Sequence, residues 1–112
     1  NSLHFFRYRP GAPLINNRYG IAEPCGRRGQ ISPQKLDIVI MPLVAFDRQG
    51  GRLGMGGGFY DRSFQSCASS RHNNSPLLLG LGHAFQEVEH LELEAWDIKL
   101  AAIATEKELI RV

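Results

Sequence analysis

A glycine-dense segment directly behind an apolar run is the sequence feature that most constrains the fold. Residues 50–62 hold six of the twelve glycines in the chain, and the apolar run 38–46 precedes them. Glycine allows φ > 0 and leaves backbone N–H groups open to a ligand. A helix start behind such a turn adds further N–H donors. A buried strand, a glycine turn and a helix in this order are typical of an anion-binding turn in an α/β protein.

The rest of the chain alternates between strand-like and helical patterns. The pattern predicts a helix at 59–67, with Phe59, Phe64 and Cys67 as candidates for its packed side. Residues 83–93 read as a short helix or a loop, and residues 10–35 as a long loop. Strands are expected at 3–8, 36–41, 77–81, 98–104 and 109–112. This order predicts one α/β domain over residues 1–112 with a largely parallel sheet.

The strand expected at 36–41 contains an apolar run, 38–41, that is continuous rather than alternating. Continuous apolar strands are typical of parallel sheets that are covered on both faces. We therefore expect a strand buried on both sides here, with Pro42 ending its regular pairing.

Bulk composition excludes several classes of protein. A net charge of +2 is too small to favour nucleic acid as the main partner. The basic tract 25–29 is better explained as a solvated loop. No apolar stretch approaches the roughly 20 residues of a membrane span. The two cysteines, Cys25 and Cys67, form no disulfide framework or metal motif, which favours a cytoplasmic protein. Because the sequence starts at Asn1 and enters strand-like sequence at once, we expect a fragment of a longer chain; a complete small domain with a trimmed first residue is the alternative.

The glycine turn belongs to neither common nucleotide-binding fingerprint. No Gly-Lys-Ser/Thr follows it, and its glycines lack the G-x-G-x-x-G register. Arg52 and Arg62 flank the turn, and arginine binds phosphate with two parallel hydrogen bonds. Asp61 is a candidate Mg²⁺ ligand, although an acid in a first helical turn also complements the helix dipole. An exposed Arg62, and a turn or flexible lid without any ligand, stay open as alternatives.

Two further groups of residues have either a structural or a ligand-binding role. Phe59 and Tyr60 are candidates to wall a flat ring, but adjacent helical residues point about 100° apart, so one of them is expected in the core. The acidic stretch 87–97 reads as a solvated face, except that Trp96 is expected to anchor Asp97.

Longer motifs resemble one known family. Residues 42–62, Pro-x-Val-Ala-Phe-Asp-x-x-Gly-x-Arg-Leu-Gly-x-Gly-x-Gly-Phe-Tyr-Asp-Arg, resemble the signature of the 5-formyltetrahydrofolate cyclo-ligases, or methenyltetrahydrofolate synthetases. Residues 19–24 resemble the upstream Gly-x-x-Glu-Pro element, and 36–40 the strand before the signature. Gln86, 94–97 and 103–105 resemble the closing segment. The resemblance covers nearly the whole chain.

The resemblance implies a three-layer, Rossmann-like α/β fold of the NagB/RpiA/CoA-transferase type, without the family's N-terminal helical part. It implies ATP- and Mg²⁺-dependent conversion of 5-formyltetrahydrofolate, with or without a polyglutamate tail, to 5,10-methenyltetrahydrofolate, with release of ADP and phosphate. A cytoplasmic monomer or weak homodimer, binding neither nucleic acid nor membrane, is expected.

The resemblance also implies roles for particular residues. Asp61 and Asp97 are expected to hold Mg²⁺, and Glu23, Phe46 and Tyr60 to contact the folate. Arg52, Tyr60 and Asp61 are the expected catalytic residues. The ATP phosphates are expected to bind at Arg52, Gly54, Met55, Gly56, Gly57, Gly58, Phe59 and Tyr60.

The sequence departs from the family pattern in ways that keep two alternatives open. Many members carry basic residues where this chain has Met55 and Gly57. Phosphate neutralisation would then depend more on the backbone and on Arg52. A non-catalytic folate- or nucleotide-binding remnant is one alternative, and a structural or interaction domain is the other.

Overall fold

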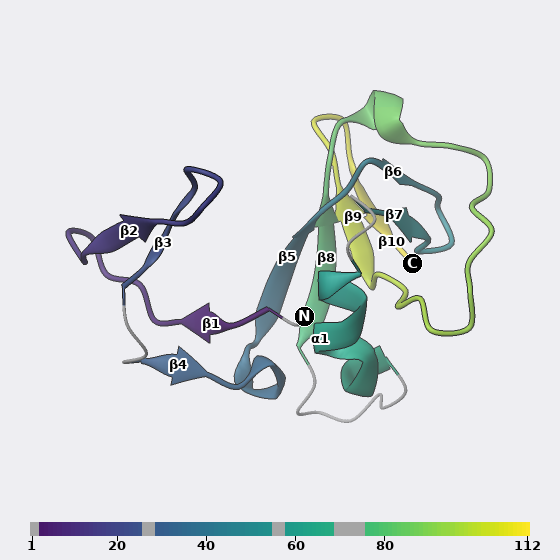
Figure 1. Cartoon of the computed structure of the whole chain (residues 1–112). Helices are drawn as coiled ribbons and strands as arrows, with labels where there is room; N and C mark the ends of the chain where they lie inside the picture. Colours follow the sequence, from purple (N-terminus) through teal and green to yellow (C-terminus); the bar gives the residue numbers. More distant parts are fainter. Residues whose placement is uncertain (1–2, 26–28, 55–57, 69–75) are drawn as a thin grey trace.

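A computed structural model describes residues 3–25, 29–54, 58–68 and 76–112 (Figure 1). Its centre is a four-stranded sheet in the order β10-β9-β8-β5. Strand β5 (Ile38–Pro42) pairs in parallel with β8 (Leu77–Leu81), and β8 pairs in parallel with β9 (Ala102–Ala104). Strand β10 (Leu109–Arg111) joins β9 antiparallel at the edge. The expected α/β class with a mixed, largely parallel sheet is confirmed.

One face of this sheet is packed against helix α1 (Phe59–Ala68). The ring of Phe64 is fully buried, and its centroid lies 5.5 Å from that of Phe5. Of the three residues expected on the packed side of the helix, Phe64 is confirmed, whereas Phe59 is 46% exposed. The side chain of Cys67 lies outside the described residues. The buried apolar core consists of Val39, Met41, Phe46, Phe64, Leu78, Ile98, Leu100, Ile103 and Ile110.

The opposite face of the sheet is apolar and exposed. In β5, Val39 and Met41 are buried while Ile38 and Ile40 are 57% and 58% exposed. Register pairs Ile38 with Leu77 and Pro42 with Leu81, so the exposed side chains form a continuous surface. We call Ile38, Ile40, Leu77 and Leu81 the bare face. The expectation of a strand covered on both sides is wrong within the described residues, because apolar side chains there do not all find a covering layer. Pro42 is the last residue of β5, so the prediction that it ends the regular pairing is confirmed.

Three short antiparallel pairs surround the sheet, and the sequence patterns predicted none of these pairings. Strand β1 (Phe5–Phe6) pairs with β4 (Gln30–Ile31), and β2 (Leu14–Asn16) pairs with β3 (Ala22–Pro24). The β2–β3 hairpin projects away from the sheet (Figure 1). Its turn is closed by Asn17, whose Oδ1 accepts hydrogen bonds from the N–H groups of Tyr19 and Ile21. The expected loop 10–35 therefore holds strands and the 3-10 helix Pro33–Lys35.

The third pair lies on either side of Gly50 and Gly51. Strand β6 (Ala45–Phe46) and β7 (Arg52–Leu53) form a hairpin whose turn is residues 47–51. The N–H of Leu100 donates to the carbonyl of Gly50 at 2.9 Å, so this donor pairs with the hairpin turn and not with the sheet. Strand β9 begins at Ala102 and not at the expected Ile98. A 3-10 helix (Ala84–Gln86) and an irregular segment follow β8.

Candidate active site

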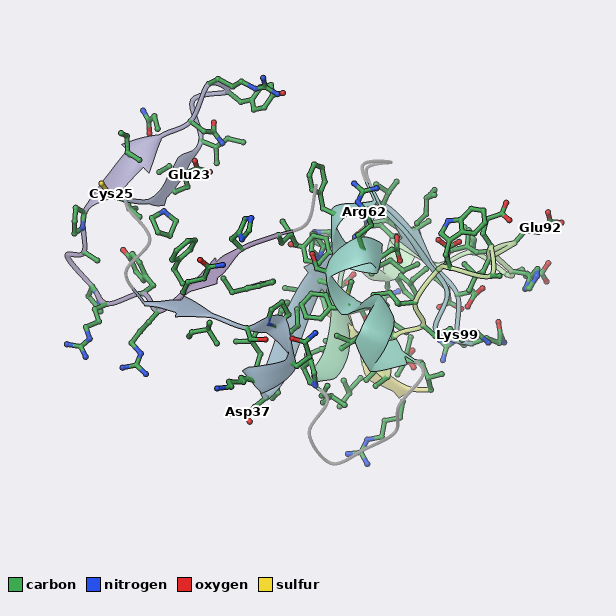
Figure 2. The ribbon with its side chains drawn as sticks, turned by 60° about the horizontal axis from the view of Figure 1, so that its bottom comes forward. Glu23, Cys25, Asp37, Arg62, Glu92 and Lys99 are labelled. Atoms are coloured by element: carbon green, nitrogen blue, oxygen red, sulfur yellow. The ribbon has the colours of Figure 1, made fainter. Side chains whose placement is uncertain are left out.

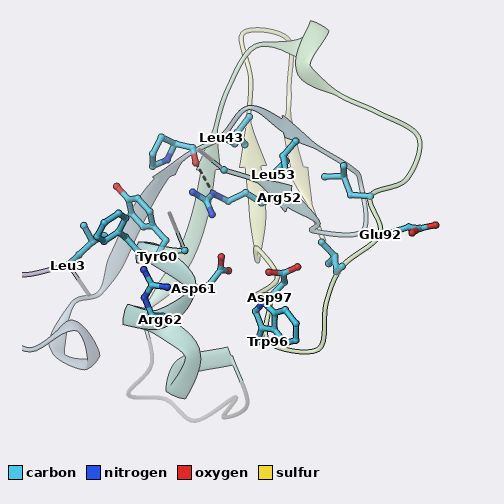
Figure 3. Close-up of a pocket in the computed structure, with 16 residues that line it drawn as sticks. Leu3, Leu43, Arg52, Leu53, Tyr60, Asp61, Arg62, Glu92, Trp96 and Asp97 are labelled. Atoms are coloured by element: carbon cyan, nitrogen blue, oxygen red, sulfur yellow. Dashed lines mark hydrogen bonds between the residues drawn. The ribbon is translucent and has the colours of Figure 1, made fainter. Parts of the chain in front are cut away.

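A pocket of about 550 Å³ opens where β5 ends (Figure 3). One wall is β7 and the link after β5, a second is the start of α1, and a third is the irregular segment before Ile98. The lining residues are Leu3, Pro42, Leu43, Arg52, Leu53, Gly54, Gly58, Phe59, Tyr60, Asp61, Arg62, Leu91, Glu92, Leu93, Trp96 and Asp97. The carboxyl end of a parallel strand is where open α/β sheets bind ligands. The pocket therefore lies where the glycine turn predicted a site.

Arg52 is the half-buried cation of this pocket. Its Nε–H donates to the carbonyl of Pro42 at 2.7 Å, which fixes the guanidinium against the end of β5. Its Cζ lies 5.1 Å from the centroid of the Tyr60 ring, within the range of a cation–π contact. Burial lowers the pKa of Arg52, and the nearby Asp61, Tyr60 and Asp97 oppose this shift. Because the ordinary arginine pKa is so high, the group stays charged at neutral pH.

Two carboxylates from distant parts of the chain face the same pocket. Asp61 lies in the first turn of α1, and its Oδ1 accepts a hydrogen bond from the N–H of Ile98 at 3.2 Å. Asp97 immediately precedes Ile98, and its Oδ2 accepts from the N–H of Glu94 at 2.8 Å. Figure 3 shows both carboxyl groups near Arg52. The fold thus brings together Arg52, Asp61 and Asp97, as the resemblance implied.

The carboxylates of the pocket fit a magnesium ion that is bound jointly by the protein and by phosphate oxygens. Mg²⁺ is commonly bound by one or two carboxylates together with phosphate oxygens and water. Asp61 and Asp97 are the two candidates here, and each is oriented by a backbone N–H. Within the described ranges, no group of three or more His, Cys, Asp or Glu residues forms a closed metal site. A dedicated protein cage is therefore not seen in this part of the chain.

The glycines of the turn divide into two sets. Gly54 and Gly58 line the pocket, and Gly58 has φ +66°, which favours glycine at the helix start. Gly51 instead serves the chain's own Asp47: its N–H donates to Asp47 Oδ1 at 2.8 Å, and a Cβ on it would lie 2.7 Å from Asp47 Oδ2. Met55, Gly56 and Gly57, predicted to bind ATP phosphates, lie outside the described residues.

The placement of the predicted folate contacts needs correction at one residue. Phe46 is fully buried in the hydrophobic core, so its ring cannot line the pocket. Tyr60 does line the pocket, as predicted. Glu23 lies exposed on β3, where its Oε2 is 3.5 Å from Asn17 Nδ2. Figure 2 shows Glu23 on the projecting hairpin, away from Arg62 at the start of α1. Glu23 is therefore not among the residues that the fold gathers at the pocket.

Some lining residues were predicted and others were not. Phe59, expected among the ATP-binding residues, lines the pocket, and so does Arg62, whose alternative was an exposed helix position. Arg62 Cζ lies 5.5 Å from the ring centroid of Phe59. Their i, i+3 spacing on one helix predicts this shared face. Trp96 is 59% exposed beside the pocket rather than a buried anchor for Asp97. Leu43, Leu91 and Leu93 give no local signal, because only the tertiary fold brings them to the site.

Comparisons with known proteins all lead to one family. The model of the 5-formyltetrahydrofolate cyclo-ligase family matches residues 1–106. The chain belongs to this family. A 5-formyltetrahydrofolate cyclo-ligase of Haemophilus influenzae is 46% identical over 99 residues, covering 88% of the chain and 51% of that protein. The Escherichia coli K12 cyclo-ligase is 45% identical over 105 residues, covering 93% of the chain and 56% of that protein.

A solved member of the family also has this fold. The structure of Aquifex aeolicus 5,10-methenyltetrahydrofolate synthetase superposes with a TM-score of 0.78 at 34% identity. The match covers 98% of the present chain and 53% of the Aquifex aeolicus chain. The chain therefore spans about half the length of the cyclo-ligases that it matches. Among the helices that the structure describes, none is long and apolar enough to cross a membrane.

Proposed function

We propose that the chain takes part in the ATP- and Mg²⁺-dependent conversion of 5-formyltetrahydrofolate to 5,10-methenyltetrahydrofolate. The observation that carries this proposal is one pocket that gathers Arg52, Tyr60, Asp61 and Asp97 at the end of a parallel strand. Relatives named for cyclo-ligase and methenyltetrahydrofolate synthetase activity supply the reaction. In it, the formyl oxygen accepts the terminal phosphoryl group and ADP leaves. N10 then attacks the activated carbon, loses its proton, and the carbon–oxygen bond to phosphate breaks.

Arg52 is suited to bind the transferred phosphoryl group. Phosphoryl transfer requires positioning and charge neutralisation more than covalent help from the protein. The guanidinium is fixed from one side by the Pro42 carbonyl and from another by the Tyr60 ring, so it loses little freedom on binding an anion. Partial burial weakens competition from water for its N–H groups. Gly54 and Gly58 keep the adjacent backbone free of side chains that would block the phosphates.

Asp61 and Asp97 would hold Mg²⁺ against the phosphate oxygens. The ion supplies Lewis-acid charge neutralisation on the transferring group when it is bound. The carboxylates themselves have a second effect, because they oppose the lowering of the Arg52 pKa that burial causes. Tyr60 remains the proposed wall for the flat folate ring. The polyglutamate tail, the role of Glu23, the cytoplasmic location and the monomeric or weakly dimeric state stay predictions.

Turnover of folate tests this function directly. Purified chain is incubated with ATP, Mg²⁺ and 5-formyltetrahydrofolate, and the methenyl product is followed by its near-ultraviolet absorbance. We expect ATP-dependent product that is lost in Arg52→Ala and Asp61→Ala. The matched controls Arg111→Ala and Asp37→Asn change exposed residues of the same types outside the pocket and should retain the activity.

The alternatives give different results in the same experiment. Tight folate or ATP binding without product would identify a non-catalytic binding remnant. Absence of both binding and product at millimolar ligand would identify a structural or interaction domain, and either outcome contradicts the proposed activity.

A further inference from the structure

Asp47 is a buried carboxylate at the turn of the β6–β7 hairpin, outside the pocket lining. Its exposed fraction is 1%. Oδ1 accepts hydrogen bonds from the N–H groups of Gln49 at 3.0 Å and Gly51 at 2.8 Å. Oδ2 accepts from the N–H of Leu91 at 2.8 Å. Three donors on a buried ionised carboxylate form strong, charge-assisted bonds. The two oxygens have different partners. Oδ1 bonds within the turn, and Oδ2 bonds Leu91, which lies 44 residues further along the chain.

Two further contacts tie the same hairpin to the same segment. The N–H of Val88 donates to the carbonyl of Phe46 at 2.8 Å, and Phe46 forms an isolated parallel bridge with Glu87. On the outside, Arg48 pairs with Glu87 at 2.9 Å and with Glu108 at 3.1 Å. Arg48 bonds both oxygens of each glutamate, so it holds Glu87 at the exposed side of the hairpin. The bond from Leu91 to Asp47 is part-buried, and Leu91 itself lines the pocket.

The two segments that Asp47 joins carry Arg52 and Asp97, two opposite charges of the pocket. The hairpin turn continues directly into β7, which contains Arg52. The other side continues through Leu91, Glu92, Leu93 and Trp96 to Asp97, all of which line the pocket. Residues 87–97 contain no strand or α-helix, so few backbone bonds of their own hold them in place. Val88 holds one end of this segment through Phe46, and Ile98 holds the other end through Asp61. The bond from Leu91 to Asp47 lies between them, so its loss would release the stretch that leads to Asp97.

We propose that Asp47 is a positioning residue that sets the placement of the Asp97-bearing segment against Arg52. It acts from behind the pocket wall and touches no substrate. The catalytic consequence of this role rests on the proposed function, whereas the placement itself does not.

Replacement of Asp47 by asparagine separates the two tasks of the carboxylate. The asparagine oxygen can occupy the Oδ1 position and keep the bonds from Gln49 and Gly51. Its NH₂ group then faces the N–H of Leu91, and two donors cannot bond to each other. The turn would stay closed while the 91–97 segment loses its anchor. Asp37→Asn makes the same chemical change at an exposed aspartate and serves as the matched control.

The single tryptophan of the chain, Trp96, lies in the segment concerned and reports its placement without any substrate. In Asp47→Asn we expect a red-shifted emission and easier quenching by acrylamide, with no such change in Asp37→Asn. Amide hydrogen exchange at Leu91 should become faster by about tenfold or more, while Gly51 stays protected. A folded Asp47→Asn protein with unchanged Trp96 emission and Leu91 exchange would overturn the proposal.

Kinetics give a readout that a general loss of stability would not produce. We expect Asp47→Asn to lower kcat/KM for Mg-ATP by about tenfold in the wild-type background, and by much less in an Asp97→Asn background, because coupled sites are non-additive. Equal factors in both backgrounds would refute positioning through Asp97. If Asp47→Asn does not fold, amide hydrogen exchange of the wild-type protein provides the test. A Leu91 amide without protection would contradict its bond to Asp47. If the wild type shows no turnover, only the proposed function fails, and fluorescence and exchange still decide the role of Asp47.

Discussion

The Nε–H of Arg52 donates to the carbonyl of Pro42 at 2.7 Å, which joins strand β7 to the last residue of strand β5. The bond uses one edge of the guanidinium and directs the remaining N–H groups toward the pocket (Figure 3). Tyr60 packs against the same group, with Arg52 Cζ at 5.1 Å from its ring centroid. The cation is thus held by the backbone on one side and by an aromatic ring on another.

Arg52→Lys should lower kcat/KM for ATP by about 100-fold, the size of effect seen when one preorganised donor is removed. Lysine keeps the charge but lacks the planar fork, so it cannot bond Pro42 and bind an anion bidentately at once. Steady-state kinetics of the cyclo-ligase reaction measure the effect. The control Arg111→Lys should have the kcat/KM of the wild type. A kcat/KM of Arg52→Lys within threefold of the wild-type value would contradict this role for the planar guanidinium.

Asp97→Asn should raise the free Mg²⁺ concentration needed for half-maximal rate, because one negative ligand is lost. Asp61→Asn should do the same while still accepting the hydrogen bond from Ile98, since asparagine retains a carbonyl oxygen. A magnesium titration of the rate provides the measurement. Glu89→Gln, an exposed change in the neighbouring segment, is the control. Identical magnesium curves for all three variants and the wild type would argue against a metal at this pair.

Acid should weaken the fold through Asp47. Burial by itself raises the pKa of this carboxyl, but the N–H groups of Leu91, Gly51 and Gln49, together with nearby His90, bring the pKa below its ordinary value of 3.8. A lowered folded-state pKa means that the stabilisation is complete above the unfolded value and is lost as the pH falls through the folded value.

Urea unfolding at several pH values measures this contribution. At pH 7, Asp47→Asn should cost about 1–3 kcal/mol in the free energy of unfolding. The gap between wild type and variant should close progressively below about pH 4. A gap that is constant from pH 7 to pH 3 would show that the charge of Asp47 is not what stabilises its bond to Leu91.

Phe64→Ala should reduce the free energy of unfolding by about 3–5 kcal/mol, because it removes a fully buried ring between α1 and the sheet. Phe85→Ala is the matched control: its ring is 83% exposed, and the cost should stay within about 0.5 kcal/mol. Chemical denaturation of both variants compares them. Equal losses would contradict the packing of α1 against this face.

The elements that were predicted correctly are those whose signals are local and continuous. Strand β8 is an unbroken apolar run, and helix α1 begins directly behind the glycines and has Phe64 on its packed side. The short hairpins gave no such signal, because strands of two or three residues are too brief to show a period. The alternation of β5 was hidden for a different reason: Ile38 and Ile40 are as apolar as Val39, so the sequence does not distinguish the buried side from the exposed one.

The site was partly predictable for the same reasons. Arg52, Tyr60 and Asp61 lie within nine residues of one another, and the motif itself groups them. Asp97 reaches them only through tertiary folding, and the family resemblance, not spacing, pointed to it. The motif misled at Phe46, an aromatic residue within the signature that is buried in the core. It also concealed that Gly51 accommodates Asp47 rather than a bound anion.

The bare face links the folding of this chain to association. Whatever binds that surface in the folded state, and not in the unfolded chain, shifts the unfolding equilibrium in proportion to the logarithm of its concentration. Ile38, Ile40, Leu77 and Leu81 belong to two adjacent strands of the central sheet, so such binding would act on the part of the fold that carries Pro42 and, through its carbonyl, Arg52. A ligand for these two strands would therefore raise the midpoint of thermal unfolding as its concentration increases.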